Sequence, residues 1–397
     1  MESDSRSGSP RLLVLGAGPA QLGLLEAARA RGLWVAVVDR DPAAPGFRHA
    51  DRRCILSPED EPPIERLVFA LGIDGIIAPG TDWPVAVAAR VAARAGLPHP
   101  ISPATAILAT NKLRQRERLA AEGVPQPRSW VVGGEEAPPA VDGPVVVKAP
   151  DRQGQKGLTL VTDPAGLATA VETARGVSRN GLALVEELVD GPEVTVVGFS
   201  IDGEFTALAV TDRLTADPPA FGVALAHVWP SHVGGQSPDV AAAAAAALGI
   251  TNGPSYTQLR IGPDGPQVIE VAARLGGGHD AELVEAAVGV DLNGLALDAA
   301  LGTELVLSQH KPRVGGAVTK FLVAPPGMLE SVEVPQGERV RIYRQPGYVF
   351  TPLRLGADRA GAVLVTGSSR DDALARAERV ASAVRFHVAE PSAQVAN

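Results

Sequence analysis

The chain has 397 residues, of which 45% are hydrophobic and 4% aromatic, and it carries a formal net charge of −9 at pH 7. This length predicts two or three domains, the apolar content suffices for large α/β cores, and the acidic balance disfavours a nucleic-acid partner. Cys54 is the only cysteine, so an internal disulfide is excluded, and no cluster of Cys and His residues indicates a zinc site. Without a recognisable secretory signal or an apolar run of membrane-spanning length, we expect a cytoplasmic protein that needs no membrane.

The first hundred residues read as a βαβ unit that is extended by a further strand and helix. Gly16 and Gly18 match the start of a dinucleotide-binding fingerprint, and Asp39 follows at about the right distance. Gln21 stands where the third glycine is needed, which favours a plain strand-to-helix turn over a dinucleotide site. We expect strands at 11–15, 34–38 and 75–78, and helices at 16–32 and 85–95.

Three prolines near residue 100 mark a linker, and a basic helix is expected at 104–122. The alternating apolar residues further along the chain predict a small α/β unit, then a strand-turn-strand hinge at 184–193, and then longer strands. These strands are expected at 129–132, 144–148, 158–161, 194–200, 204–210, 256–261 and 266–272. Helices are expected at 164–175, 239–248, 280–301 and 370–384.

Polar side chains lie at the ends of several of these strands. Lys148 closes an apolar strand, where burial of an unpaired ammonium is costly, so a phosphate is its natural partner. The loop 151–157 contains Gly154 and Gly157, whose flexibility lets backbone N–H groups approach phosphate oxygens, and Lys156 adds charge. The loop lacks the Walker sequence, and read alone it is also compatible with a hairpin turn.

A second group of polar residues follows the last strand pair. Glu270 ends a strand, and a strand-end carboxylate is a ligand that Mg²⁺ accepts. Arg274 comes four residues later, where its guanidinium can grip a carboxylate or a phosphoryl group, or form a structural pair with an acid. His279 and Asp280 follow a glycine run, where a polar loop residue and a helix cap are equally good explanations.

In this order and at this spacing, the parts resemble the nucleotide site of the ATP-grasp ligase superfamily, over about residues 106–300. The resemblance implies an α/β chain with an ATP-grasp fold, an N-terminal Rossmann-like pre-ATP-grasp domain and a C-terminal α+β domain. The implied boundaries are 1–105 for the N-terminal domain, 106–310 for the ATP-grasp domain with its lid at about 120–185, and 311–397 for the C-terminal domain.

The resemblance also implies roles for individual residues. ATP would bind with Lys112 and Lys148 on its phosphates, and Lys148 and Arg274 would be catalytic. The complete implied nucleotide set is Lys112, Lys148, Gly154, Lys156, Gly157, Glu186, Glu187, Val189 and Glu193, with the adenine held at 186–189 and the ribose at Glu193. The substrate would meet His227, Arg274, Gly277 and His279.

The proposed metal site and the proposed substrate pocket each depart from the family pattern. The implied metal ligands for Mg²⁺, or alternatively Mn²⁺, are Glu270 and the residue at 258, which is here the uncharged Gln258. Three residues before His227, amino-acid ligases of the family carry a Glu that faces the substrate, and this chain has Ala224. An ordinary α-amino acid is therefore disfavoured as acyl donor, because its ammonium would lack a counter-charge.

The function implied is that of an ATP-dependent carboxylate–amine ligase, a C–N ligase that forms an amide bond through an acylphosphate and releases ADP and phosphate. Its partners would be a small-molecule carboxylate and an amine, and a homodimer is expected. One alternative is an ATP-grasp carboxylase or formyl-transfer-type ligase of nucleotide biosynthesis. Alternatives of other classes are an NAD-dependent oxidoreductase built on the first βαβ unit and a non-catalytic ATP-binding module.

Overall fold

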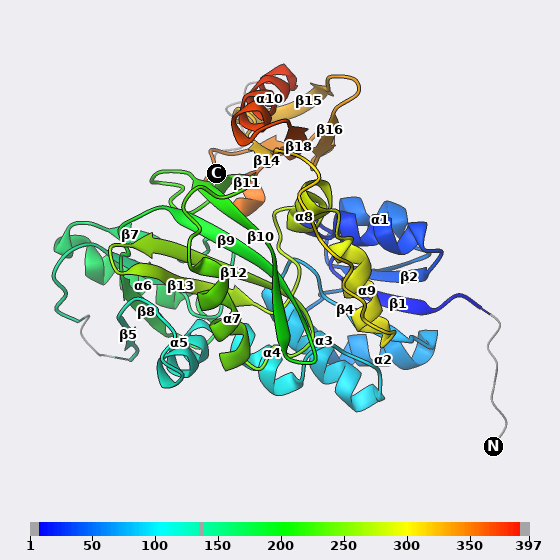
Figure 1. Ribbon diagram of the computed structural model, residues 1–397, viewed down its shortest axis with the longest axis horizontal. Helices are drawn as coiled ribbons and strands as arrows, with labels where there is room; N and C mark the ends of the chain where they lie inside the picture. Colours follow the sequence, from blue (N-terminus) through cyan, green and yellow to red (C-terminus); the bar gives the residue numbers. More distant parts are fainter. Residues whose placement is uncertain (1–7, 135–138, 390–397) are drawn as a thin grey trace.

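The computed structural model describes residues 8–134 and 139–389 (Figure 1). The N-terminal unit, drawn in blue, lies on one side of the molecule, and the green strands of the middle part lie on the other. The orange and red C-terminal elements pack above the junction between them. Within the described residues, none of the helices is both long enough and apolar enough to cross a membrane.

The N-terminal unit is a parallel sheet whose strand order is β3-β2-β1-β4. The central strands β1 and β2 are buried along most of their length, as expected for a parallel sheet with helices on both faces. The strand β3 and the helix α2 were not predicted, because β3 is short and buries only Cys54, and α2 has two prolines in its first turn. The elements are β1 (Arg11–Leu15), α1 (Leu22–Ala30), β2 (Trp34–Asp39), β3 (Arg52–Ile55), α2 (Glu61–Leu71), β4 (Gly75–Ile77) and α3 (Asp82–Ala95).

The basic segment expected as one helix at 104–122 is two helices, α4 (Pro103–Ala109) and α5 (Lys112–Ala121). The chain breaks at Asn111, whose side chain accepts hydrogen bonds from the backbone N–H groups of Leu113 and Arg114. This N-cap starts α5 at Lys112 and directs that lysine toward the middle of the molecule.

The next unit is a four-stranded sheet in the order β5-β8-β6-β7, covered by one helix. Its strands agree with the predicted positions, because each is a short apolar run with buried valines. Its elements are β5 (Ser129–Val132), β6 (Val145–Lys148), β7 (Thr159–Val161), α6 (Leu167–Val177) and β8 (Ala183–Glu187).

A second, eight-stranded antiparallel sheet has the order β13-β12-β9-β10-β11-β14-β18-β16. The predicted hinge joins the two sheets, because β8 belongs to the four-stranded sheet and β9 to the eight-stranded one. The middle part of the chain supplies β9 (Glu193–Ile201), β10 (Glu204–Thr215), β11 (Ala224–Trp229), α7 (Ser237–Ala247), β12 (Gly253–Gly262), β13 (Gly265–Ala272), α8 (Asp280–Val288) and α9 (Leu292–Leu301). α8 and α9 share an apolar core with β1 and β2, which fixes the N-terminal sheet against this part of the chain.

The large sheet continues through β14 and β18 into the C-terminal part, so the proposed boundary near residue 310 separates segments of one sheet. A small sheet in the order β17-β15-β19 and the helix α10 complete this part. The elements are β14 (Gly316–Leu322), β15 (Gly327–Glu333), β16 (Arg339–Ile342), β17 (Val349–Phe350), β18 (Gly361–Gly367), α10 (Arg370–Ala383) and β19 (Arg385–Ala389).

Candidate functional site

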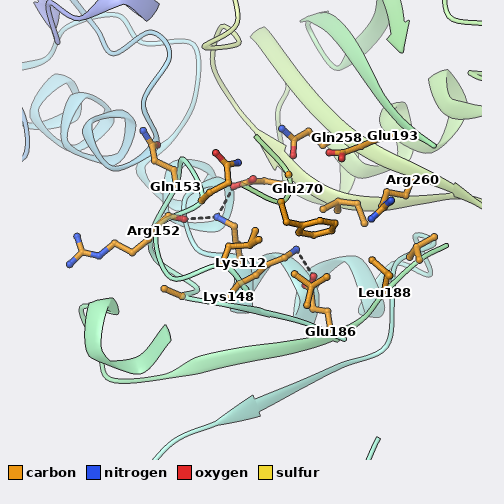
Figure 2. Close-up of a pocket in the computed structure, with 18 of the residues that line it drawn as sticks. Lys112, Lys148, Arg152, Gln153, Glu186, Leu188, Glu193, Gln258, Arg260 and Glu270 are labelled. Atoms are coloured by element: carbon orange, nitrogen blue, oxygen red, sulfur yellow. Dashed lines mark hydrogen bonds and ion pairs between the residues drawn. The ribbon is translucent and has the colours of Figure 1, made fainter. Parts of the chain in front are cut away.

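Two adjoining cavities lie where these units meet. The first, of about 740 Å³ including its open mouth, lies between the four-stranded sheet and the end of the large sheet (Figure 2). The second, of about 2020 Å³, is bounded by the N-terminal unit, the glycine loop 151–157 and the C-terminal part. Both cavities are lined by Gln258 and Glu270, so the pair stands at the boundary between the two spaces.

Lys148 is buried at the end of β6 and forms an ion pair with Glu186 on the neighbouring strand β8 (Figure 2). The other oxygen of Glu186 accepts a hydrogen bond of 2.6 Å from Arg116 on α5. Burial alone would raise the pKa of Glu186, but Arg116 and Lys148 lower it to about 2, so the carboxylate is ionised. The pKa of Lys148 is lowered, chiefly by burial, which Glu186 opposes only in part.

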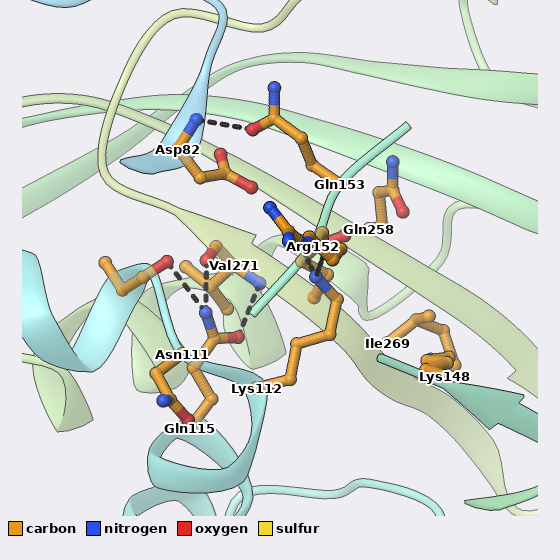
Figure 3. A network of polar contacts seen from close by, with 12 residues as sticks. Asp82, Asn111, Lys112, Gln115, Lys148, Arg152, Gln153, Gln258, Ile269 and Val271 are labelled. Atoms are coloured by element: carbon orange, nitrogen blue, oxygen red, sulfur yellow. Dashed lines mark hydrogen bonds and ion pairs between the residues drawn. The ribbon is translucent and has the colours of Figure 1, made fainter. Parts of the chain in front are cut away.

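Lys112 lies 2.7 Å from Glu270, and its ammonium also donates a hydrogen bond of 2.8 Å to the carbonyl oxygen of Arg152. Burial lowers the pKa of Lys112, but Glu270 and Asp82 outweigh it and raise the pKa. The position of the helix is set by Gln115, whose amide exchanges hydrogen bonds with both backbone groups of Val271 on β13 (Figure 3). These hydrogen bonds fix the start of α5 against β13 and so hold Lys112 close to Glu270.

The glycine loop forms the wall that the two cavities share. Gly154 and Lys156 line both spaces, whereas Gly157 lines neither and packs tightly against α6. The loop also contacts the N-terminal unit, because the side-chain oxygen of Gln153 accepts a hydrogen bond of 2.5 Å from the backbone N–H of Asp82 (Figure 3).

The hinge forms the far wall of the first cavity. Leu188 and the buried Val189 line the cavity together with Glu187, whose carboxylate pairs with the exposed Arg128. A Cβ atom at Gly191 would lie 1.9 Å from the carbonyl oxygen of Ile261, so only glycine permits the hinge to approach β12 this closely.

Glu193, at the start of β9, lines the first cavity beside the hinge. Its carboxylate is 2.7 Å from Arg213 on β10, which lines both cavities. Gln258 and Glu270 are directly opposed on the antiparallel strands β12 and β13, as the proposed metal pair requires. Gln258 also donates a hydrogen bond of 3.3 Å to the hydroxyl of Tyr256.

In the second cavity, Arg274 forms an ion pair with Asp82 at 2.6 Å, which joins the end of the ATP-grasp-like segment to the N-terminal unit. Gly277 and His227 also line this cavity, and burial lowers the pKa of His227 to about 4. Ala224 lies in the same lining. The fourth proposed substrate residue, His279, is buried behind the wall and contacts the hydroxyl of Tyr343 at 2.5 Å.

Comparisons with known proteins agree with this arrangement. The family described as L-amino acid ligase C-terminal domain 2 matches residues 320–389. A formate-dependent phosphoribosylglycinamide formyltransferase from Burkholderia lata is 28% identical and aligns over 97% of this chain and 99% of its own. The crystal structure of an L-amino acid ligase from Bacillus licheniformis superposes with a TM-score of 0.82, at 22% identity, over 97% of this chain and 100% of that one.

The chain thus resembles ATP-grasp ligases, in sequence over its C-terminal part and in fold over nearly its whole length. Its fold is the expected α/β ATP-grasp fold, since structures of ATP-grasp enzymes superpose over nearly the whole chain. One of them, the biotin carboxylase domain of a 2-oxoglutarate carboxylase from Hydrogenobacter thermophilus, was crystallised as a dimer with MgADP and bicarbonate. It superposes with a TM-score of 0.79, at 19% identity, over 96% of this chain and 92% of that one.

An ATP-grasp site needs hard oxygen ligands for Mg²⁺, and the donor set fits this requirement in part. Glu270 supplies one carboxylate, and the opposed Gln258 supplies a neutral amide oxygen, so phosphate oxygens and water would complete the coordination. Within the described ranges, no group of three or more His, Cys, Asp or Glu side chains could hold a metal ion without the nucleotide.

The loop that follows β1 is filled by the side chain of Gln21. The amide of Gln21 donates to the carbonyl oxygen of Pro79 at 2.5 Å. A Cβ atom at Gly16 would lie 3.0 Å from the Gln21 side chain, and a Cβ atom at Gly18 would lie 3.2 Å from it. Asp39 accepts a hydrogen bond of 2.8 Å from the backbone N–H of Ala17 in the same loop. The loop is therefore packed as a structural turn, which disfavours the dinucleotide-binding alternative.

Sequence reasoning missed several residues of the site. Arg116, Arg213, Tyr343 and Arg359 line the cavities or hold residues that do, but they lie at ordinary positions on helices, strands and loops. No local motif marks them, because their roles arise only when distant segments meet. Asp82 had a signal, since it begins α3 directly after the loop that follows the parallel strand β4.

Proposed function

We propose that the chain is an ATP-dependent carboxylate–amine ligase that forms an amide bond through an acylphosphate and releases ADP and phosphate. The observation that carries this proposal is the position of Glu270, which lines both cavities and lies beside Lys112. A nucleotide in the first cavity would direct its terminal phosphate across this boundary, toward an acid in the second cavity.

The reaction needs no side-chain nucleophile. A carboxylate oxygen of the donor attacks the γ-phosphorus of ATP, and the bond from that phosphorus to the β-bridging oxygen breaks to release ADP. The amine then attacks the acyl carbon, the bond from carbon to the phosphate oxygen breaks, and the amine loses a proton as phosphate leaves. Catalysis of this kind depends mainly on positioning and charge stabilisation.

The residues of the chain supply that stabilisation. Lys112 and Lys148 would transfer from their carboxylate partners to the phosphates, and Arg274 would stabilise the charge that develops on the transferring group. Mg²⁺, held by Glu270 and Gln258, would neutralise phosphate charge when the nucleotide is bound. The hinge at 187–189 would hold the adenine and Glu193 the ribose, as the superfamily resemblance implies.

The test is the identity of the nucleotide product. We expect acid-dependent formation of ADP and phosphate in a screen of carboxylates, with hydroxylamine as a general amine that converts acylphosphates into hydroxamates. Chromatography of the nucleotide then separates the mechanisms. Stoichiometric AMP and pyrophosphate would show an adenylate mechanism and contradict the proposal.

A second candidate is a formyl-transfer-type ligase, because a relative of that name aligns over 97% of this chain. In that case formate would be the only acid to support ADP release, and the amine would be a phosphorylated ribosyl amine. Activity with larger acids and no dependence on formate would dismiss it. The homodimer stays a prediction, which light scattering on the purified protein tests.

A further inference from the structure

Tyr343 follows β16 and lines the second cavity, although its side chain is largely buried. Its ring packs in one apolar cluster with Ala224, Phe321 and Ala362. The tyrosine therefore stands beside the position where amino-acid ligases of the superfamily carry a Glu and this chain has Ala224. A tyrosine thus takes part in this end of the cavity, where the family has a carboxylate.

The hydrogen bonds behind Tyr343 determine which way its proton points. Arg341 donates to Nδ1 of His279 at 2.9 Å, and a guanidinium has no acceptor, so Nδ1 must be the unprotonated nitrogen. Glu282 lies 3.4 Å from the same nitrogen, but a proton there would face the donor of Arg341. His279 therefore carries its proton on Nε2 and donates it to the Tyr343 hydroxyl oxygen, 2.5 Å away.

The tyrosine hydroxyl accepts that hydrogen bond and keeps its own proton to donate. Burial raises the pKa of Tyr343, so the hydroxyl is protonated at neutral pH. In the described part of the chain, His279 is the one hydrogen-bond partner recorded for this hydroxyl. The proton therefore has no acceptor among the described residues, and Tyr343 lines the second cavity.

Arg359 adds a second donor at this end of the cavity. Its guanidinium lies over the ring of Phe321, 3.7 Å from the centroid, and donates to the carbonyl oxygen of Gly356. Among residues 8–134 and 139–389, no carboxylate forms an ion pair with it. The carboxylates that line this cavity belong instead to the N-terminal unit, the loop 151–157 and β13, namely Asp39, Glu59, Asp82, Asp151 and Glu270.

We infer that Tyr343 is a substrate-binding residue, positioned by His279, and that it donates a hydrogen bond to an oxygen on the acid. The acid then carries a hydroxyl, an oxo group or a second carboxylate where an α-amino acid carries its ammonium. The inference rests on the proposed function for its assignment of the second cavity to the acid. A site built to donate a hydrogen bond to oxygen discriminates against analogues that lack the oxygen.

The experiment measures binding by titration calorimetry, in the presence of Mg²⁺ and a non-hydrolysable ATP analogue. The probes are matched sets of acids with one side chain, namely the 2-hydroxy, 2-oxo, 2-carboxy, 2-amino and unsubstituted forms, taken over several side-chain sizes. For the wild type, we expect at least one oxygenated form to bind about fivefold or more tightly than both the unsubstituted and the amino form, the effect of one neutral hydrogen bond.

Tyr343→Phe should remove the preference for oxygenated over unsubstituted acids and leave the affinity for the ATP analogue unchanged. His279→Asn, which suits the left-handed backbone at φ 61°, should reduce the preference in part, because the hydroxyl loses its orienting donor. Tyr348→Phe is the matched control, since Tyr348 lies in the same part of the chain and is 37% exposed. It should keep the wild-type preference.

Three results would overturn the inference: an unchanged preference in Tyr343→Phe, a wild-type preference for the amino form, or no binding of any acid set. A loss of all binding in Tyr343→Phe, with the ATP analogue still bound, would be followed by Tyr343→Met, whose flexible side chain fills the space without an N–H or O–H donor. Equal preference ratios in Tyr343→Met and wild type would also overturn the inference. The proposed function fails separately, if acids bind as expected and no ADP forms.

Discussion

The two cavities differ in how their charges are balanced. In the first, two of the three lining lysines have an acid partner, since Lys112 pairs with Glu270 and Lys148 with Glu186. At the C-terminal end of the second cavity, the donors of Tyr343 and Arg359 face the space without a carboxylate partner among the described residues. The two buried lysines of the first cavity, the proposed nucleotide site, are thus neutralised before a ligand arrives, whereas this end of the second cavity, the proposed substrate site, has donors that a ligand can still engage.

The partner of Lys148 differs from the one that the sequence predicts. A phosphate was expected as the partner of the buried Lys148, but Glu186 already limits the cost of burying that ammonium. A phosphate would therefore have to replace the carboxylate, while Arg116 keeps Glu186 paired. The sequence could not show this, because the three residues come from separate segments that meet only in the fold.

The largest expected effect comes from breaking the paired side. Lys148→Ala should reduce turnover by about 100-fold or more, because one donor to the developing phosphate charge is lost. Lys320→Ala is the matched control, since Lys320 forms an exposed ion pair with Glu378 and lines neither cavity. Steady-state kinetics and circular dichroism measure activity and folding. A folded Lys148→Ala protein with wild-type turnover would remove this lysine from the site.

The proposed metal ligands Glu270 and Gln258 allow Mg²⁺ binding to be weakened by one substitution and strengthened by another. Glu270→Gln should raise the Mg²⁺ concentration for half-maximal activity by about tenfold or more, because an amide binds Mg²⁺ less well than a carboxylate. Gln258→Glu should lower that concentration, since the two residues are directly opposed across β12 and β13. A magnesium titration compares both variants with the wild type. No change in Gln258→Glu would mean that residue 258 does not contact the metal.

The choice of acyl donor is tested by comparing each α-amino acid with its des-amino analogue. Because Ala224 provides no counter-charge, the des-amino acids should have kcat/KM values a few-fold higher, as expected when a cation would be left unpaired in a buried site. Phosphate release at fixed ATP and amine is the measurement. Consistently higher values for the free amino acids would show that another acid, such as Asp82, holds the ammonium.

The fold was predictable from the sequence to a considerable extent, because its core strands are clear apolar runs at the expected spacing. The elements β3 and α2 were not predicted, because they are short and bury few residues. The break at Asn111 was indicated only by a residue type that favours helix N-caps, inside a basic segment. The motif residues Lys112, Lys148, Glu193 and Glu270 all line the first cavity. His279 was expected to face the substrate, but it does not line the second cavity and contacts the Tyr343 hydroxyl instead.

The smallest expected effect concerns stability and pH. The pKa of His227 is lowered to about 4 from an ordinary value of 6.5, so the unfolded chain binds the proton more readily. The stability that comes from keeping His227 neutral in the folded state is fully present above pH 6.5 and is lost progressively as the pH falls toward 4. Denaturant unfolding should therefore show that wild type loses about 1 kcal/mol more stability than His227→Gln between pH 7 and 5.5. Parallel stability curves for the two proteins would contradict this.

The most direct test of the acylphosphate mechanism follows the oxygen of the acid. The donor that gives the greatest ADP release is labelled with oxygen-18 in its carboxylate, and the products are analysed by phosphorus NMR after one round of amide formation. The account predicts that one labelled oxygen per turnover appears in inorganic phosphate and none in the nucleotide. Label in AMP, or in neither product, would contradict it.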